Sequence, residues 1–309
     1  MTMVTDGLFQ YGGEPVGSVR FTNPWASVIF VDGDDGATRF EGNKPNRAKL
    51  TFAQGITAAS YNDIIYVRPR KPGGSTAGDA SDVGWYAEVG TTIPFAKHAL
   101  SIIGVLHGGS SMYGAMLWPS DGCGFDVYAS AFHAENLNVH AESVTYAVRL
   151  RGTAGYATQA GACGSTLTNC TFGYGSVLVT GGGDTRISGC QFRNATLNYD
   201  ASATPARRHR VENCWFGANN GAARTGPYFS IAGSQSEFLM KGCYFDQPTS
   251  TDEYISSTGV NDGLIADCYF ADNDMSWGST AEDEIRVASG TLAVVGCYDD
   301  TGTMITNTG

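Results

Sequence analysis

Two acidic residues and one basic residue occupy equivalent places in three successive copies of a recurring hexamer. Arg208, Glu237 and Asp262 each stand three residues before the first position of a copy. Two carboxylates about 5 to 9 Å apart can hydrolyse a glycosidic bond, because one donates a proton while the other acts as base or nucleophile. If the copies stack in register, Glu237 and Asp262 lie one coil apart with Arg208 beside them. These three residues are the catalytic candidates, and charged residues of ordinary turns are the alternative.

An aromatic residue recurs at the fifth position of the hexamer in four consecutive copies. These residues are Trp215, Tyr244, Tyr269 and Tyr298. Rows of outward-pointing aromatic side chains stack on sugar rings or pack in subunit interfaces, where Trp and Tyr are enriched. Packing under the chain's own loops is a third interpretation. We expect an interface or loop packing in preference to sugar binding.

The histidines and cysteines predict no metal or redox centre. The histidines form no triad and no ligand spacing: His98, His107, His133, His140 and His209. No CxxC pair occurs, and most of the 8 cysteines share the fourth position of the hexamer. That position favours a small buried hydrophobic side chain, which a free thiol supplies. We therefore expect structural histidines and buried free thiols.

Two acidic segments could offer oxygen ligands to calcium. The first is DGDDG, with Asp32, Asp34 and Asp35, which lacks the glutamate at the twelfth place of an EF-hand loop. The second is a loop that contains Asp272, Asp274, Glu282, Asp283 and Glu284. We interpret both as solvated acidic loops. No metal ion and no cofactor is predicted.

The charge balance limits the partners of the chain. It has 19 Lys and Arg residues against 30 Asp and Glu residues, a formal net charge of -11. Such a chain cannot gain affinity by neutralising phosphate groups, which argues against binding to nucleic acid and to an anionic membrane surface. The basic tetramer RRHR at 207–210 is too small to reverse this balance. No stretch approaches the roughly 18 apolar residues of a membrane span, and the first residues lack the pattern of a secretory signal.

The hexamer recurs along the second half of the chain. Its copies are LTNCTF at 167–172, ISGCQF at 187–192, VENCWF at 211–216, MKGCYF at 240–245, IADCYF at 265–270 and VVGCYD at 294–299. Only 16% of residues are charged and 41 are glycine, which excludes a helical bundle. Copies at variable intervals indicate a fixed structural unit joined by loops of changing length.

The pattern inside the hexamer predicts two short strands that meet at a one-residue corner. The third position is Asn, Gly or Asp, the types that tolerate a left-handed backbone. Cys and Phe, two positions apart beyond this corner, then point to the same inner side. Parallel stacking about 4.8 Å apart places like residues on like. The predicted fold is an all-β, right-handed parallel β-helix, because crossovers between parallel strands are right-handed. Two weaker copies at 102–107 and 134–139 put Val105 and Leu137 at the cysteine position.

The amino-terminal part of the chain lacks the repeat. Residues 46–60 have apolar residues at helical spacing after Pro45, which predicts a short capping helix over the open first coil. The segment 63–69 then forms the first buried strand. We therefore divide the chain into an amino-terminal arm (1–29), a capping segment with a short helix (30–62) and the β-helix (63–309).

Residues 30–69 resemble the opening of many right-handed β-helix proteins of the pectate-lyase-like superfamily. The similarity rests on the turn DGDDG, the capping helix and the phrase DIIYVRP at 63–69. That superfamily includes pectate lyases, polygalacturonases, bacteriophage tailspikes and virion proteins of tailed phages without known activity. The calcium-binding signatures of the pectate lyases are not recognisable here.

The resemblance implies a virion protein, assembled in the host cytoplasm, more than a secreted enzyme. The start and end of the chain also look more like a phage component than a secreted lyase. We expect a non-enzymatic homotrimer that decorates the head or forms a short spike, with the arm contacting other virion proteins. One alternative is a polysaccharide depolymerase of the tailspike kind, either a lyase or a glycoside hydrolase. The other is a non-catalytic module that binds a cell-surface glycan.

Overall fold

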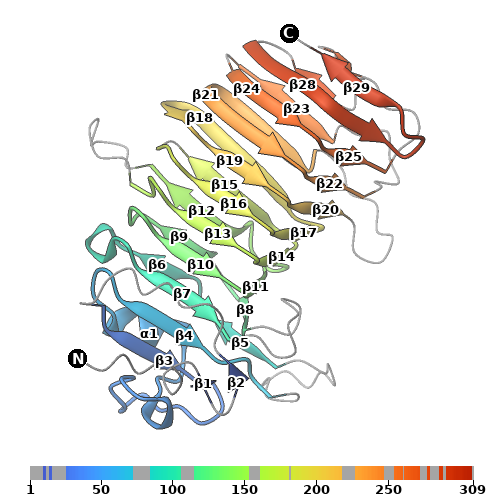
Figure 1. Ribbon diagram of the computed structural model, residues 1–309. Coiled ribbons are helices and arrows are strands. Elements are labelled where there is room, and N and C mark those ends of the chain that lie inside the picture. Colours follow the sequence, from blue (N-terminus) through green and yellow to red (C-terminus); the bar gives the residue numbers. More distant parts are fainter. Residues whose placement is uncertain are drawn as a thin grey trace, which may run out of the picture.

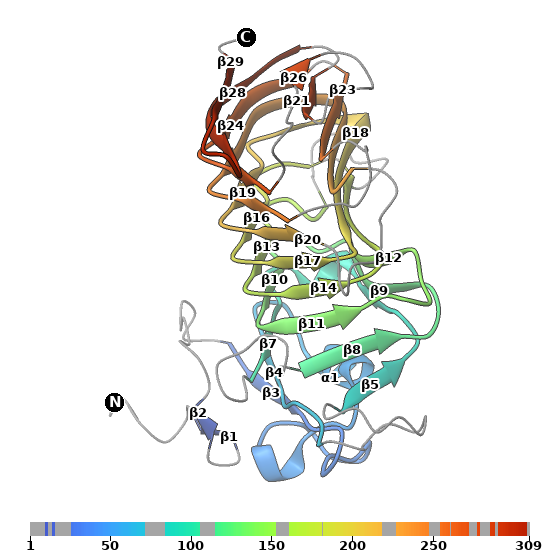
Figure 2. The ribbon, with the colours of Figure 1, turned by 90° about the vertical axis from the view of Figure 1, so that its right-hand side faces the viewer.

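The strands of this protein return to the same three sheets once in every coil (Figure 1). The computed structural model describes residues 10–11, 14–15, 26–71, 84–105, 115–152, 161–180, 182–217, 227–246, 254–259, 261–271, 277–278, 285–287 and 290–307. Nearly all strand pairs among them are parallel. The fold is the right-handed parallel β-helix that the hexamer predicts. Figure 2 shows the coils stacked from the amino-terminal to the carboxyl-terminal end.

Three sheets form the sides of the β-helix. Sheet 1 contains β3 (Val28–Val31), β4 (Ile64–Val67), β7 (Ser101–Gly104), β10 (His133–Glu135), β13 (Thr166–Thr168), β16 (Arg186–Ser188), β19 (Arg210–Glu212) and parts of β21 (Phe229–Lys241), β24 (Asn261–Ala266) and β28 (Gly290–Asp299). Sheet 2 contains β5 (Trp85–Glu88), β8 (Ala115–Pro119), β11 (Leu137–His140), β14 (Thr171–Gly173), β17 (Gln191–Arg193), β20 (Trp215–Gly217), β22 (Tyr244–Phe245), β25 (Tyr269–Phe270) and the end of β28. Sheet 3 contains β6 (Thr91–Ile93), β9 (Cys123–Val127), β12 (Tyr146–Arg151), β15 (Ser176–Thr180), β18 (Thr196–Arg207), the start of β21, β23 (Ile255–Thr258), β26 (Trp277–Gly278) and β27 (Ile285–Val287). Outside them lie β1 (Gln10–Tyr11) and β2 (Glu14–Pro15), which pair with each other.

A single left-handed residue forms the corner between sheets 1 and 2, as predicted. The corner residues with positive φ are Asn136, Asn169, Gly189, Asn213, Gly242, Asp267 and Gly296. The alternation of Asn or Asp with Gly has a steric cause. The Oδ1 atom of Asn169 lies 2.4 Å from the place that a Cβ of Gly189 would take. Asn213 stands in the same relation to Gly242, at 2.7 Å. At these two corners the Asn side chain takes the space that a Cβ on the next coil would need, and a glycine leaves that space open.

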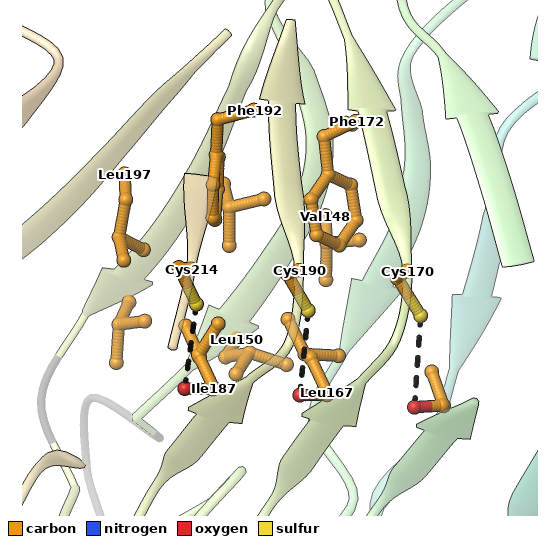
Figure 3. Packing of buried hydrophobic residues seen from close by; sticks show 14 of the residues in the cluster. Val148, Leu150, Leu167, Cys170, Phe172, Ile187, Cys190, Phe192, Leu197 and Cys214 are labelled. Carbon is orange, nitrogen blue, oxygen red and sulfur yellow. Dashed lines mark hydrogen bonds between the residues drawn. The ribbon is translucent and has the colours of Figure 1, made fainter. Parts of the chain in front are cut away.

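The cysteines and phenylalanines of the hexamer fill the interior in two ladders (Figure 3). Most of these thiols lie within reach of a carbonyl oxygen of the preceding coil: the Cys190 Sγ lies 3.5 Å from the Leu167 oxygen, and the Cys214 Sγ lies 3.7 Å from that of Ile187. All 8 cysteines are free, and the six of the hexamer are buried, as expected. Burial raises the pKa of Cys190, which keeps it a thiol.

The phenylalanine ladder is a continuous aromatic stack. From Phe192 through Phe216 and Phe245 to Phe270, successive ring centroids are 4.6, 4.8 and 4.8 Å apart, with interplanar angles of 10°, 7° and 8°. Asp299 follows Phe270 in register and ends the series. The predicted register of the hexamer is therefore confirmed.

The β-helix begins earlier than predicted. The first strand is β3, which pairs in parallel with β4, so the segment 63–69 is the second strand of sheet 1. β3 starts at Val28, inside the segment assigned to the arm. The sequence pattern does not identify this strand, because Pro24 and Trp25 precede a run of only four apolar residues. Such a short run cannot be distinguished from a loop by its pattern alone.

The predicted capping helix is shorter than 46–60. A 3-10 turn, η1 (Pro45–Arg47), is followed by α1 (Phe52–Ala58). Between them Lys49 is extended and hydrogen-bonds with the outer edge of β3 at Phe30 and Asp32. This backbone covers the open edge, while α1 covers the end of the apolar core: Phe52 contacts the rings of Tyr86 and Phe125 at centroid distances of 4.9 and 5.7 Å.

A carboxylate from a distant strand holds α1 in place. Glu88 of β5 accepts hydrogen bonds from the backbone nitrogens of Phe52 and Ala53, at 2.8 and 3.0 Å. Thr51 caps the same end by accepting from Gln54. These bonds satisfy free N–H groups of the first helical turn. Burial nevertheless raises the pKa of Glu88.

Val105 does not occupy the cysteine position. Ala115 of β8 pairs with Leu137 and takes that place. Val105 instead belongs to a second apolar cluster, which lies on the outer face of sheet 1 and also contains Phe30, Ala48, Ile64, Tyr66 and Ile103. Leu137 does occupy the predicted position and is buried.

The last coil is also better covered than the sequence suggests. β29 (Met304–Asn307) folds back and pairs antiparallel with β28. Asp299 forms the turn by accepting hydrogen bonds from the backbone nitrogens of Thr301 and Thr303, at 3.0 and 2.8 Å. An antiparallel strand interrupts the parallel ladder and so limits further addition of strands.

The aromatic stack generates a stability prediction. Phe216 is fully buried between two phenylalanine rings, whereas Tyr244 is 38% exposed on the outer side of the next coil. Phe216→Ala should lower the free energy of unfolding by about 3 to 5 kcal/mol because it opens a cavity. Tyr244→Ala, the matched control, should have a much smaller effect. Denaturant unfolding measures both, and equal effects would contradict the register.

Candidate functional site

The three catalytic candidates lie together at the corner between sheets 3 and 1. Arg207 pairs with Ser236 and Phe238 pairs with Gly263, which aligns Arg208, Glu237 and Asp262 on three successive coils. Arg208 and Glu237 have positive φ, as corner residues do. The register predicted from the hexamer therefore holds for this row.

The contacts of this row belong to the turns. Arg208 binds Asp184 of the preceding coil through two bonds, Nε to Oδ1 at 2.8 Å and Nη2 to Oδ2 at 2.9 Å. The Oδ1 atom of Asp262 accepts a hydrogen bond from the backbone nitrogen of Glu237 at 2.8 Å. Glu237 and Asp262 are both exposed. Arg208 thus stabilises its neighbour's corner, and the assignment of this row to catalysis stays a prediction.

The four aromatic residues form one row on the outer face of sheet 2. Trp215 pairs with Tyr244, Tyr244 with Tyr269, and Tyr269 with Tyr298. The rings of Tyr244 and Tyr269 stack at 5.0 Å with an interplanar angle of 12°. Because these two rings face each other along the row, they present edges and hydroxyl groups to the outside. Such a ridge suits an interface better than stacking on a sugar ring.

Trp215 has a different orientation from the tyrosines. Its indole atoms Cη2 and Cζ2 lie 2.4 Å from the place that a Cβ of Gly217 would occupy. The indole therefore extends along its own strand over the glycine. The guanidinium of Arg193 lies 5.9 Å from the indole centroid, within the range of a cation–π contact. Within the row, Trp215 is the residue whose orientation best suits the stacking of an external ring, such as that of a sugar.

A second aromatic group on the outer face of sheet 2 was missed by the sequence interpretation. Trp118 lies between Trp85 and His140, with centroid distances of 5.1 and 4.1 Å, and Tyr174 follows His140 at 4.9 Å. Tyr174 has a positive φ, which is uncommon for an aromatic residue. Trp85 and Trp118 lie outside every copy of the hexamer, and His140 and Tyr174 each follow a copy at a position that the hexamer does not include, so no repeated position marked this group.

Each described histidine contacts a neighbouring side chain, and the structural role expected for them stays a prediction. His98 stacks on Tyr61 at 5.2 Å, and the His133 Nε2 lies 3.1 Å from Glu135. Burial lowers the pKa of His140 below its usual value, and the nearby carboxylate of Glu142 opposes this shift without reversing it. His107 lies outside the described residues.

His209 is the most deeply buried of these histidines. Its Nδ1 forms a 2.6 Å hydrogen bond with the hydroxyl of Thr185, and its ring packs on Tyr199 at 4.8 Å. Burial lowers the pKa of His209 to about 4, against the opposing influence of Asp184. The imidazole is therefore neutral in the folded protein near neutral pH.

No group of three or more metal-ligating side chains occurs among the described residues. The DGDDG turn is not solvated throughout: Asp32 is buried, bonds to the Arg68 guanidinium at 2.9 Å and accepts from the nitrogens of Asp34 and Asp35. This carboxylate holds a turn and an arginine. The second acidic segment, with Asp272, Asp274, Glu282, Asp283 and Glu284, lies outside the described residues.

Comparisons with known proteins identify the fold alone. No protein-family model and no curated protein matches the sequence. A rhamnogalacturonan lyase structure has 9% identity and a TM-score of 0.56, over 89% of this chain and 74% of the other. A pectin methylesterase from Aspergillus niger has 13% identity and a TM-score of 0.50, over 93% of each chain. A tailspike of Acinetobacter baumannii bacteriophage Fri1, a capsular polysaccharide depolymerase, has 13% identity and a TM-score of 0.41, over 77% of this chain and 48% of the other. Within the described residues no helix is long and apolar enough to cross a membrane.

His209 predicts a loss of stability in acid. Its pKa is 6.5 without burial and about 4 in the fold, so the unfolded chain binds a proton first as the pH falls. The contribution of His209 is fully present above pH 6.5 and is lost between pH 6.5 and 4, by up to about 3 kcal/mol. The free energy of unfolding, measured at several pH values, should fall less steeply with decreasing pH for His209→Leu than for the wild-type protein. His98→Leu, at an exposed histidine, is the control, and equal slopes in all three proteins would contradict the assignment.

Proposed function

We propose that this chain is a structural, non-enzymatic virion protein of a tailed bacteriophage, forming a homotrimer that decorates the head or makes a short spike. The observation that carries the proposal is the exposed aromatic row at the carboxyl-terminal end of sheet 2. Tyr244 is 38% exposed and Tyr298 is 43% exposed, although both have large apolar rings. A closed ring of subunits would bury this row.

The surroundings of the row support an association surface. Val295, on the same strand as Tyr298, is 39% exposed, and Met304, which pairs with Tyr298, is 58% exposed. Large apolar side chains that gather in one region of a surface mark contact sites with other proteins. Tyr and Met are enriched in the cores of such interfaces. The apolar residues of β28 and β29 thus extend the row around the end of the β-helix.

The contacts of the catalytic candidates support a non-enzymatic role. Arg208 is engaged by Asp184, and Asp262 accepts from the backbone of Glu237. The resemblance of residues 30–69 to β-helix proteins that include phage virion components supports the location in a virion. The amino-terminal arm, residues 1–29, would contact other virion proteins. Most of this arm lies outside the described residues.

The alternative is a polysaccharide depolymerase. It is favoured by Glu237, whose carboxylate is exposed one coil away from Asp262. Solved structures with the same fold include a rhamnogalacturonan lyase and a pectin methylesterase. A non-catalytic glycan-binding module is the second alternative, favoured by the orientation of Trp215 over Gly217.

The trimer is tested by charge placed on the exposed row. Light scattering during gel filtration should give the mass of three chains for the wild-type protein and of one chain for Tyr244→Glu combined with Tyr298→Glu. Buried like charges oppose association, while an exposed position on a monomer tolerates them. Tyr61→Glu, at a 58% exposed tyrosine far from this end, is the control. A wild-type monomer at every concentration tested, or a trimeric double variant, would contradict the proposal.

The enzymatic alternative has its own test. Purified wild-type protein should release no reducing or unsaturated ends from capsular polysaccharide or polygalacturonate. Cleavage that Glu237→Gln or Asp262→Asn abolishes would replace the structural role with that of a depolymerase. Arg186→Gln, at an exposed ion pair on the neighbouring sheet, serves as the control.

A further inference from the structure

Sheet 3 carries two arginines that converge on one carboxylate. Asp126 of β9 pairs with Arg149 of β12, and Arg151 lies two residues further along β12. All three side chains point outward, since the residues that alternate with them, Val127 and Leu150 among others, are buried in the core. This cluster therefore lies on the outer face of the β-helix, away from the aromatic row of sheet 2.

The carboxylate is shared and leaves a positive charge in excess. Arg149 donates from Nε to Oδ1 at 2.9 Å and from Nη2 to Oδ2 at 2.7 Å. Arg151 donates from Nε to the same Oδ1 at 2.7 Å. Two guanidinium groups thus face one carboxylate. In the other Lys and Arg ion pairs of the described residues, the carboxylates are at least as many as the cations.

Aromatic rings hold both arginines in position. The guanidinium of Arg149 lies 5.2 Å from the Tyr146 centroid, and that of Arg151 lies 5.1 Å from the Tyr128 centroid. The two side chains are 24% and 31% exposed, so each is mostly packed but still reaches solvent. A guanidinium held in this way loses little freedom when it binds a further partner.

The outward N–H groups of the cluster have no protein acceptor in the described part of the chain. The hydrogen bonds to Asp126 engage only the Nε of Arg151 and the Nε and Nη2 of Arg149. The neighbours in register are Thr92, Leu178 and Thr180, none of which carries a charge. The protein has a net charge of -11, so its carboxylates outnumber its cations. Among the described residues, however, only the carboxylate of Asp126 accepts hydrogen bonds from these two arginines.

We propose that Arg149 and Arg151 form a binding site for an oxyanion, the carboxylate of an acidic sugar or a phosphate group. Guanidinium groups match both anions, because their N–H groups form paired, charge-assisted hydrogen bonds with two oxygens. Asp126 orients the two arginines and neutralises one of them. The inference goes beyond the proposed function and does not depend on the oligomeric state.

Calorimetric titration with sodium glucuronate, and separately with inorganic phosphate, tests the site at constant ionic strength. The wild-type protein should bind at least one of them, and the stronger of the two identifies the anion. Arg151→Gln should weaken binding at least about tenfold, as expected for loss of one charge-assisted hydrogen bond. Asp126→Asn should strengthen it, because the competing carboxylate is lost while both arginines remain. Arg186→Gln should leave it unchanged.

Circular dichroism establishes whether each variant is folded. If Asp126→Asn does not fold, the comparison of the wild-type protein with Arg151→Gln and Arg186→Gln still tests the site. The assignment would be overturned by a wild-type protein that binds neither anion. It would also be overturned if Arg151→Gln binds as tightly as wild type, or if Arg186→Gln weakens binding equally. Weaker binding by a folded Asp126→Asn would contradict the competing role given to that carboxylate.

Discussion

The structure depends on the register in which each coil stacks on the one before it. Parallel backbone hydrogen bonds fix the spacing of the coils, and a single left-handed residue at the corner between sheets 1 and 2 fixes which residue begins the next strand. A slip by one residue would turn every side chain of a strand to the opposite face. The corner pair Asn169 and Gly189 opposes such a slip, because a side chain at Gly189 would collide with the Oδ1 atom of Asn169. Cysteine and phenylalanine ladders inside, and aromatic rows outside, follow from this one constraint.

The sequence predicts the repeating half of the molecule well, since each hexamer carries its own corner, inner and outer positions. The stack around Phe216, the corner at Asn213 and the outer row from Trp215 to Tyr298 could all be placed by counting. The amino-terminal coils could not be placed in this way. Val105 matched the pattern, but Ala115 takes the position expected for it.

Contacts between residues far apart in the chain could not be predicted from the sequence pattern. Nothing local shows that Glu88 would cap α1 or that Lys49 would cover the edge of β3. The candidate site divides in the same manner. The row of Arg208, Glu237 and Asp262 was found because the repeat aligns it, whereas its engagement in the turns depends on side-chain contacts between coils. The cluster of Arg149 and Arg151 lies on sheet 3, outside the positions that the hexamer copy at 134–139 marks.

A β-helix separates stability from function by face. The interior holds the apolar ladders, and every second residue of a strand is free to vary on an outer face. Sheet 2 carries the aromatic row that we assign to subunit contacts, and sheet 3 carries the arginine cluster that we assign to an oxyanion. An experimental structure of the assembled protein tests the central claim most directly. We expect Tyr244 and Tyr298 to be buried between neighbouring subunits around a threefold axis. Subunits that meet through another face, with both tyrosines in contact with solvent, would contradict it.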